Sequence, residues 1–204
     1  MNQTGDARLH APAAERNVDA VVAAVAPRSP GGGLALEIAA GSGRHAVALA
    51  AALPHLDWRP TDIGDAELAS VEAWRAVSGL PNLAPARRFD AVAERWDGPP
   101  AAMTYFSNLL HLVSEDDFRA VIATTAAALG PGGRAFVYGP FLRADGYASD
   151  GDRRFDAELR RRDPAIGYKR LGDVEAALEA AGLAMAERVE MPANNLLLVA
   201  DARP

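Results

Sequence analysis

A short loop with two glycines is the clearest candidate for a chemical site in this sequence. Residues 34–40 form an apolar run that carries one acid, Glu37, and the chain then breaks into GSG at residues 41–43. Glycines at such a break let the backbone turn tightly and approach a ligand, and a helix that begins there points its N-terminus at the same place. The pattern G-x-G-x-x-A over residues 41–46 is typical of nucleotide sites and by itself permits a nicotinamide dinucleotide.

Two acids near the loop bear on which cofactor it would hold. Glu37 lies inside the apolar run, where a carboxylate would repel a pyrophosphate but would tolerate a ligand with an amino group and a sulfonium. Asp62 ends the next predicted strand, about twenty residues after the loop, and an acid there can accept hydrogen bonds from both ribose hydroxyls. Asp62 suits a nicotinamide dinucleotide and S-adenosylmethionine equally.

The sequence lacks the residues that several other catalytic chemistries require. The chain has no cysteine, which excludes disulfides, thiolate nucleophiles and cysteine-bound metals. Its four histidines are scattered without the paired spacing of a metal site, and there is no G-x-S-x-G nucleophile turn. We therefore expect neither a metal centre nor a dedicated nucleophile.

The elements that must position these residues alternate between strands and helices. Hydrophobic periodicity and turn residues predict strands at residues 34–40, 57–62, 84–89, 101–108, 134–141, 184–191 and 194–202. The same signals predict helices at residues 13–26, 43–53, 66–78, 115–129, 153–162 and 172–181. Asp65 and Ser114 are predicted N-caps, and the glycines at 130–133 are predicted to end a helix.

This alternation predicts an α/β protein. We expect one domain over residues 1–204, with an open, mostly parallel sheet between two layers of helices. The connection at residues 192–194 is too short for a crossover, so the last two strands must pair antiparallel. Ligands of such sheets bind outside the carboxyl ends of the strands, where the strand order reverses. This rule brings together residues 40–45, Asp62, Asp90, 107–111 and 138–141.

The net charge of the chain bears on which classes of partner it can bind. The formal net charge is −6, and Lys169 is the only lysine. An acidic chain is a poor candidate for binding nucleic acid. The one dense basic cluster, residues 153–163, is interleaved with acids, as in a solvated helix face. The first residues lack the pattern of a signal peptide, and no apolar run approaches the roughly 18 residues that span a bilayer. We expect a cytoplasmic protein without a membrane partner.

Several segments resemble one family. LEIAAGSGRHA, the acid in PTD, ALGPGGRAFVYGP and LEAAGL are similar to the successive motifs of class I S-adenosylmethionine-dependent methyltransferases. HAPAAERN, EIAAGSGRHAV, AALPHLDWRPTD, NLLH, GPGGRAFVYGPF and MPANNLLLV more specifically resemble the DUF938, or methyltransferase-like 26, proteins over about His10 to Val199. The resemblance implies a three-layer αβα Rossmann-like sandwich. Its seven strands would run in the order 3-2-1-4-5-7-6, with the last strand antiparallel.

The resemblance also implies where S-adenosylmethionine would bind. Gly41, Ser42 and Gly43 would pack against its methionine part, and Asp62 would take the ribose hydroxyls. Asp90 would bind the adenine amine, or else cap a helix.

Four further residues are implied around the methionine end. Glu37 would hold the loop or face the amino group of the cofactor through water, or else serve as a structural acid bonded to backbone amides. His45 would touch the cofactor carboxylate or only cover the loop. Ser107 and Asn108 would lie where the methyl group is transferred.

The methyl acceptor would meet residues from several segments. His111 and Tyr138 are the candidate catalytic residues, and both, with Phe141, are candidate acceptor contacts, although each of them also suits a packing role. The helix at 13–26 would cover the site, and the irregular segment 143–170 would complete it.

Two polar pairs frame the chain. Arg16 and Asn17 interrupt a helix that otherwise buries valines, so they would face the site or form a salt-bridged surface. Asn194 and Asn195 would contact the acceptor or only form a turn.

The leading hypothesis is therefore a methyltransferase that transfers the methyl group of S-adenosylmethionine to a small molecule. The reaction leaves S-adenosylhomocysteine and uses no metal. A non-catalytic adenosine-cofactor binder or scaffold and an NAD(P)-dependent oxidoreductase are the alternatives.

Overall fold

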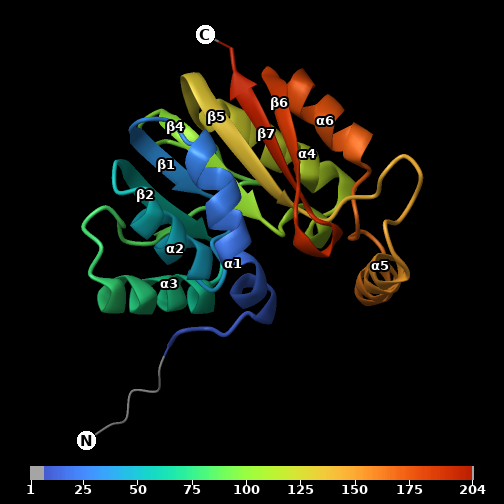
Figure 1. The fold of residues 1–204 in the computed structure, drawn as a ribbon, viewed down its shortest axis with the longest axis horizontal. Helices are drawn as coiled ribbons and strands as arrows, with labels where there is room; N and C mark the ends of the chain where they lie inside the picture. The colour runs from blue at the N-terminus through green and yellow to red at the C-terminus, as the bar shows by residue number, and fades with distance from the viewer. Residues whose placement is uncertain (1–6, 204) are drawn as a thin grey trace, which may run out of the picture.

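The centre of the molecule is a sheet of seven strands in the order β3-β2-β1-β4-β5-β7-β6 (Figure 1). The computed structural model describes residues 7–203. The strands are β1 (Gly33–Glu37), β2 (Leu56–Asp62), β3 (Arg87–Arg88), β4 (Ala101–Ser107), β5 (Leu129–Gly139), β6 (Leu183–Glu190) and β7 (Leu196–Ala202). All neighbours are parallel except β7, which is antiparallel to both β5 and β6. The predicted sheet, its strand order and the antiparallel last strand are confirmed.

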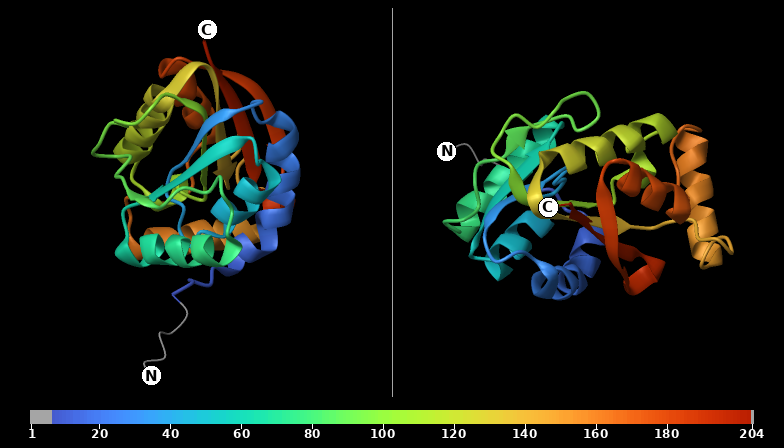
Figure 2. Two further views of the ribbon diagram at one scale, coloured as in Figure 1. Left: turned by 90° about the vertical axis from the view of Figure 1, so that its left-hand side faces the viewer. Right: turned by 90° about the horizontal axis from the view of Figure 1, so that it is seen from above.

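Helices cover both faces of this sheet. The helices of residues 7–203 are α1 (Pro12–Val25), α2 (Arg44–Ala52), α3 (Asp65–Ser78), α4 (Glu115–Ala128), α5 (Asp150–Arg162) and α6 (Leu171–Ala180), with short 3-10 turns η1 (Ala26–Arg28), η2 (Leu110–Leu112) and η3 (Pro192–Asn194). Figure 2 shows α1 and α2 on one side of the sheet and α4 and α6 on the other. No helix among residues 7–203 is long and apolar enough to cross a membrane.

Each face of the sheet has its own apolar core. Val21, Val25 and Leu49 of α1 and α2 pack on one face. Phe118 of α4 and Leu178 of α6 pack on the other. Because strand side chains alternate between faces, the two layers hold the sheet rigid between them and fix where its carboxyl edge lies.

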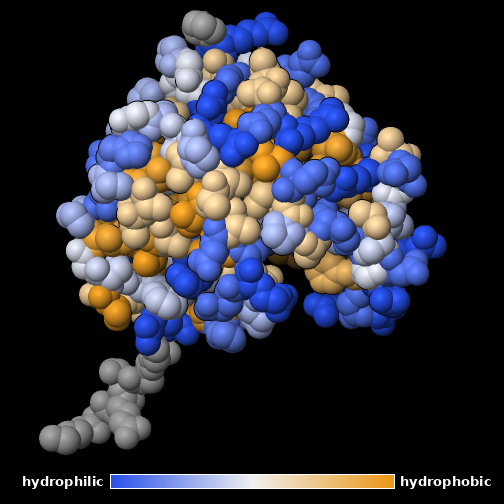
Figure 3. Space-filling model, in the orientation of Figure 1, coloured by the Kyte–Doolittle hydropathy of each residue, from blue (hydrophilic) through white to orange (hydrophobic). Residues whose placement is uncertain are grey.

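Helix α5 stands apart from these layers. It lies in the segment 143–170 and projects at one end of the sheet (Figure 1). Its surface is mostly hydrophilic, as Figure 3 shows, and its last turn carries three exposed arginines, Arg160, Arg161 and Arg162. The basic cluster is thus the solvated helix face that the interleaved acids predicted.

Three local predictions need correction. The third strand is only Arg87–Arg88, shorter than residues 84–89. The fifth strand begins at Leu129 and not at residue 134: the glycines at 130–133 follow the end of α4 at Ala128, as predicted, but they lie inside β5, where Gly132 adopts φ +69° and the pairing with β4 shifts register. Asp65 is not an N-cap: Gly64 precedes the helix without a side-chain bond, and the Asp65 carboxylate pairs with Arg88 instead. The cap at Ser114 is confirmed, since its hydroxyl accepts from Asp117 N at 3.1 Å.

Two non-glycine residues with left-handed backbone mark the carboxyl edge of the sheet. Ala39 follows β1 with φ +54°, and Asn108 follows β4 with φ +56°. Such conformations cost about 1–3 kcal/mol each and gather at functional sites. Both residues line the same cavity.

Candidate functional site

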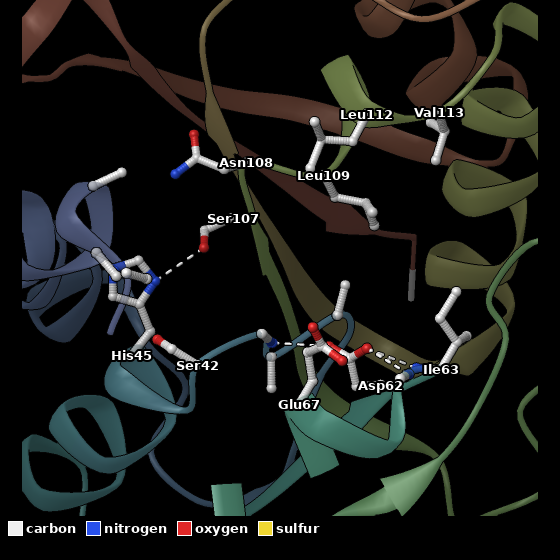
Figure 4. A pocket seen from close by; sticks show the side chains of 17 residues that line it. Ser42, His45, Asp62, Ile63, Glu67, Ser107, Asn108, Leu109, Leu112 and Val113 are labelled. Atoms are coloured by element: carbon white, nitrogen blue, oxygen red, sulfur yellow. Dashed lines mark hydrogen bonds between the residues drawn. The ribbon is translucent and has the colours of Figure 1, made fainter. Parts of the chain in front are cut away.

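A cavity of about 660 Å³ opens at the carboxyl ends of β1, β2 and β4 (Figure 4). This is the edge at which the strand order reverses, between β1 and β4. Four segments wall it: the start of α1, the loop after β1 with the first turn of α2, the end of β2 with the start of α3, and the end of β4 with the turn η2. Its volume lies in the range of small-molecule sites.

The two glycines of the loop have different tasks. Gly41 adopts φ +56° and lines the cavity, and a Cβ built on it meets no protein atom within 4 Å. Gly43 adopts φ +82° and does not line the cavity. A Cβ on Gly43 would approach Val71 Cα of α3 at 3.0 Å. Gly41 therefore leaves space for a ligand, whereas Gly43 lets α2 and α3 pack closely.

Asp62 joins β2 to the glycine loop. Its Oδ2 accepts from Gly41 N at 2.8 Å, and its Oδ1 accepts from Ile63 N at 2.7 Å and from Gly64 N at 3.1 Å. The carboxylate lines the cavity while these amides hold it. Since a carboxylate has about four acceptor positions, Asp62 can still accept from a ligand.

Asp90 lines a smaller cavity of about 80 Å³ that adjoins the first. The two cavities share Ala39, Asp62, Ile63, Leu109 and Val113. The Asp90 carboxylate also accepts from Val92 N at 2.9 Å and Ala93 N at 3.2 Å. Asp90 thus closes a turn and borders the cavity at once.

His45 is the centre of a buried polar network in the cavity wall. It is 4% exposed, its Nδ1 lies 2.9 Å from Ser107 Oγ, and its Nε2 lies 2.8 Å from Asn17 Oδ1. Burial, and secondarily the charge of Arg44, lowers the pKa of His45 to about 4. The ring is neutral at pH 7 with both nitrogens engaged, so it has no free N–H for a cofactor carboxylate.

The network continues away from the cavity to Tyr138. Asn17 Nδ2 donates to the Tyr138 hydroxyl at 3.3 Å. Burial raises the pKa of Tyr138, and hydrogen bonds with Asn17 and Asn195 oppose that rise. Neither Tyr138 nor Asn17 lines the cavity. The structure therefore places Tyr138 behind His45 and not at the predicted point of contact with an acceptor.

Glu37 lies behind the loop in the core. It is 2% exposed and does not line either cavity. Its Oε2 accepts from Trp58 Nε1 at 2.6 Å, so its partner is an indole and not the backbone amides of one prediction. Burial raises the pKa of Glu37 to about 8, although the Trp58 hydrogen bond opposes the rise.

His111 faces α5 and not the cavity. It is 6% exposed, and its ring packs against Phe155 at 5.8 Å and Tyr168 at 6.2 Å between centroids. Burial, followed by the charge of Lys169, lowers its pKa to about 4. The position after β4 suggested a catalytic base, but the turn η2 directs Leu112 to the cavity and His111 away from it.

The other predicted acceptor contacts also lie elsewhere. Phe141 is buried in the core under α4, and Arg16 is exposed on α1. Asn194 Nδ2 donates to Asp152 Oδ2 of α5 at 2.9 Å. Asn195 Nδ2 donates to Pro192 O at 3.1 Å within the η3 turn. None of these residues lines the cavity.

Several lining residues were missed from the sequence. They are Ala11, Ala13, Ala14, Ala39, Ile63, Gly64, Glu67, Leu112 and Val113. The sequence offered one signal, since Ile63 directly follows the acid that ends β2. The structure leaves Ile63 60% exposed, which is unusual for isoleucine. The alanines among residues 11–14 carry no such signal, because only the packing of α1 places its first turn beside the loop.

Among residues 7–203, no group of three His, Asp or Glu side chains is arranged to hold a metal ion. The polar groups around the cavity are hydroxyls, the amide of Asn108, a neutral imidazole and carboxylates. This donor set can bind hydroxyl and amino groups of an organic ligand.

A protein family model described as "Protein of unknown function (DUF938)" matches residues 8–201 of this chain. Solved structures of methyltransferases share its fold. An O-methyltransferase family protein from Burkholderia thailandensis is 19% identical to this chain, with a TM-score of 0.78. The match covers 91% of this chain and 55% of the Burkholderia protein. The S-adenosylmethionine-dependent methyltransferase SibL is 20% identical with a TM-score of 0.76, covering 94% and 56%.

This chain therefore spans about half the length of those two proteins. The YcgJ protein from Bacillus subtilis has a similar length: it is 14% identical with a TM-score of 0.71, covering 93% of this chain and 99% of its own. At these identities the likeness shows a common fold.

Proposed function

The chain belongs to the DUF938 family of proteins of unknown function, and we propose that it is an S-adenosylmethionine-dependent methyltransferase that acts on a small molecule. The observation that carries the proposal is the hydrogen bond from Gly41 N to Asp62 in the wall of the cavity. It puts a fixed carboxylate beside a glycine whose missing side chain leaves room for a ligand.

The charges of the cavity walls favour this cofactor over a dinucleotide. Three carboxylates, Asp62, Glu67 and Asp90, line the two cavities, and no lysine or arginine does so among residues 7–203. A pyrophosphate would meet acids without a compensating cation. A ligand with a sulfonium and an ammonium group suits the same walls. The walls therefore argue against the NAD(P) alternative.

Each wall has a task in this proposal. Asp62 would accept the ribose hydroxyls, Asp90 would accept the adenine amine, and Ile63 and Leu109 would supply the apolar surface between them. When bound, S-adenosylmethionine supplies a methyl group on a positively charged sulfur, which makes that group transferable. The protein would contribute orientation and the exclusion of water.

A small molecule is the favoured acceptor because the cavity holds about 660 Å³ and much of its lining is apolar. Ala11, which precedes α1, and Ala13 and Ala14 of α1 line it. Leu112 and Val113 also line it and are seen in Figure 4. SibL, which shares the fold, is described as S-adenosylmethionine-dependent, and this adds support for the cofactor.

Calorimetry tests the cofactor. S-adenosylmethionine and S-adenosylhomocysteine should bind, and NAD should not. Asp62→Ala should weaken binding at least about tenfold, since it removes hydrogen bonds to a charged group. Asp57→Ala is the matched control, because Asp57 lies on the same strand but is exposed and outside the cavity. Absence of binding by both adenosyl ligands would contradict the proposal.

A second experiment separates an enzyme from a non-catalytic binder. A set of hydroxylated and amino metabolites is incubated with the protein and S-adenosylmethionine, and S-adenosylhomocysteine is measured. Formation of product that depends on both a metabolite and Asp62 supports catalysis. Tight cofactor binding without any turnover would favour the binder.

A further inference from the structure

The two asparagine-containing segments that frame the chain both act on Tyr138. Asn17 comes from AAERN near the start, and Asn195 comes from PANNL near the end. Asn17 Nδ2 donates to the Tyr138 hydroxyl at 3.3 Å, Asn195 opposes the rise that burial causes in the pKa of Tyr138, and Tyr138 itself is 1% exposed. Neither asparagine lines the cavity. Their effect on the site must therefore pass through another residue, and Asn17 reaches His45.

The asparagine determines which nitrogen of His45 carries a hydrogen. Because Asn17 donates to Tyr138 through Nδ2, its other amide atom, Oδ1, faces His45 Nε2 at 2.8 Å. A carbonyl oxygen only accepts, so Nε2 must carry the hydrogen. Since the ring is neutral, Nδ1 is then a bare acceptor.

The bare nitrogen fixes the hydrogen of Ser107. Nδ1 has a single lone pair, and Ser107 Oγ at 2.9 Å is nearer to it than the Tyr105 hydroxyl at 3.2 Å, so Ser107 is its hydrogen-bond donor. Because Ser107 donates its hydroxyl hydrogen to His45 Nδ1, its oxygen can only accept hydrogen bonds from a ligand in the cavity that it lines. Figure 4 shows His45 and Ser107 joined on one wall.

The walls near Ser107 add little charge of their own. Leu109, Leu112 and Val113 lie along the side that continues from β4, and the first turn of α1 lies opposite. The only lysine of the chain, Lys169, is turned away from the cavity and donates to Val113 O at 2.7 Å and Gly167 O at 3.0 Å. None of the arginines and lysines of residues 7–203 lines the cavity, so an anionic ligand would meet no cation from this part of the chain.

We propose that Asn17 and His45 are positioning residues that make Ser107 Oγ a hydrogen-bond acceptor. The methyl acceptor of this site is then a mainly apolar molecule without a negative charge, whose hydroxyl or N–H group donates to Ser107. That this ligand is a methyl acceptor rests on the proposed function, whereas the hydrogen-bonding polarity of Ser107 does not depend on it.

The first test measures that polarity without any ligand. Nitrogen-15 NMR of the His45 ring at pH 7 should show a neutral imidazole with its hydrogen on Nε2. Asn17→Asp keeps an oxygen acceptor and should preserve this tautomer, whereas Asn17→Ala should lose it. Asn17→Asp should also raise the pKa of His45, because a carboxylate stabilises the imidazolium. A wild-type ring with its hydrogen on Nδ1 would overturn the proposal.

The second test uses three small probes with the protein saturated by S-adenosylhomocysteine. Phenol has a donor, anisole has the same ring without one, and benzoate is an anion. Phenol should bind about fivefold tighter than anisole, as expected for one hydrogen bond, and benzoate should bind most weakly. Ser107→Ala should abolish the preference for phenol, and Ser107→Thr should keep it. Ser78→Ala, which removes a hydroxyl of α3 outside the cavity, should also keep it.

The outcomes separate the two proposals. Failure of S-adenosylhomocysteine to bind, with the Nε2–H tautomer present, contradicts the proposed function alone. Equal binding of phenol and anisole in the wild type overturns the assignment of Ser107. If S-adenosylhomocysteine itself loses affinity in Ser107→Ala and the probes are unaffected, the donor on Ser107 is the ammonium group of the cofactor, and the acceptor assignment is wrong.

Discussion

The buried acid Glu37 makes stability depend on pH in a way that a single substitution can isolate. Its carboxyl group is 2% exposed and has one side-chain partner, Trp58 Nε1 at 2.6 Å. Burial raises its pKa from 4.5 to about 8, and the nearby charge of Asp62 adds to the rise. At pH 5 to 8 the native protein therefore keeps a proton on Glu37 that the unfolded chain releases.

The sign and size of the effect follow from this difference. Because the pKa is raised in the native state, the stabilisation is complete below pH 4.5 and is lost as the pH rises through about 8. Each pH unit in this window costs the native state up to about 1.4 kcal/mol. Glu37→Gln carries no titrating group. Its free energy of unfolding relative to the wild type should therefore rise by up to about 4 kcal/mol from pH 5 to 8.

Urea unfolding of both proteins at half-unit pH steps measures this difference. Any constant offset between them reflects the fit of the amide, and only its change with pH tests the reasoning. Glu187→Gln is the control: Glu187 is exposed beside Arg28, its pKa is lowered, and its difference from the wild type should stay flat over pH 5 to 8. A flat difference for Glu37→Gln as well would refute a protonated, buried Glu37.

Further predictions concern the loop and the two buried histidines. Gly41→Ala should cost about 1–2 kcal/mol for its left-handed backbone and weaken S-adenosylhomocysteine binding, because its methyl group enters the cavity. Gly43→Ala should cost about 1–3 kcal/mol more, since its methyl group also meets Val71, and equal unfolding free energies for the two variants would contradict this. His45 and His111 have lowered pKa values, so their stabilisation is complete above pH 6.5 and lost as the pH falls toward 4. In urea titrations each histidine should lower the free energy of unfolding by up to about 1.4 kcal/mol per pH unit over this range. If His111→Asn had the same dependence of unfolding free energy on pH as the wild type, the prediction for His111 would be wrong.

The fold and the loop could be predicted because their signals are local. Apolar periodicity located the strands and helices, and the short connection at residues 192–194 required the antiparallel hairpin. The rule for strand ends brought Asp62 to the glycine loop, and the structure joins it to Gly41 N at 2.8 Å. The third strand was predicted too long, because Arg87–Arg88 pairs only at the sheet edge and has little periodicity to mark its ends.

The directions of side chains could not be predicted in the same way. His111 and Leu112 are neighbours in one 3-10 turn, yet Leu112 lines the cavity and His111 packs on Phe155 of α5. The partner of Glu37 is an indole from the next strand, which sequence spacing alone does not reveal. A residue at a strand end can point to either side, and the packing of distant segments selects one.

By itself the sequence determined the order of the elements, the class of the sheet and the residues of its glycine loop, since these follow from periodicity, glycine and turn length. Only the tertiary structure decided the chemistry of the cavity wall. Asn17, His45 and Ser107 are 28 and 62 residues apart along the chain, and they form one network because α1, α2 and β4 converge at the carboxyl edge of the sheet. Hydrogen bonds act over about 3 Å, so their partners are set by where the packed elements meet and not by spacing in the sequence.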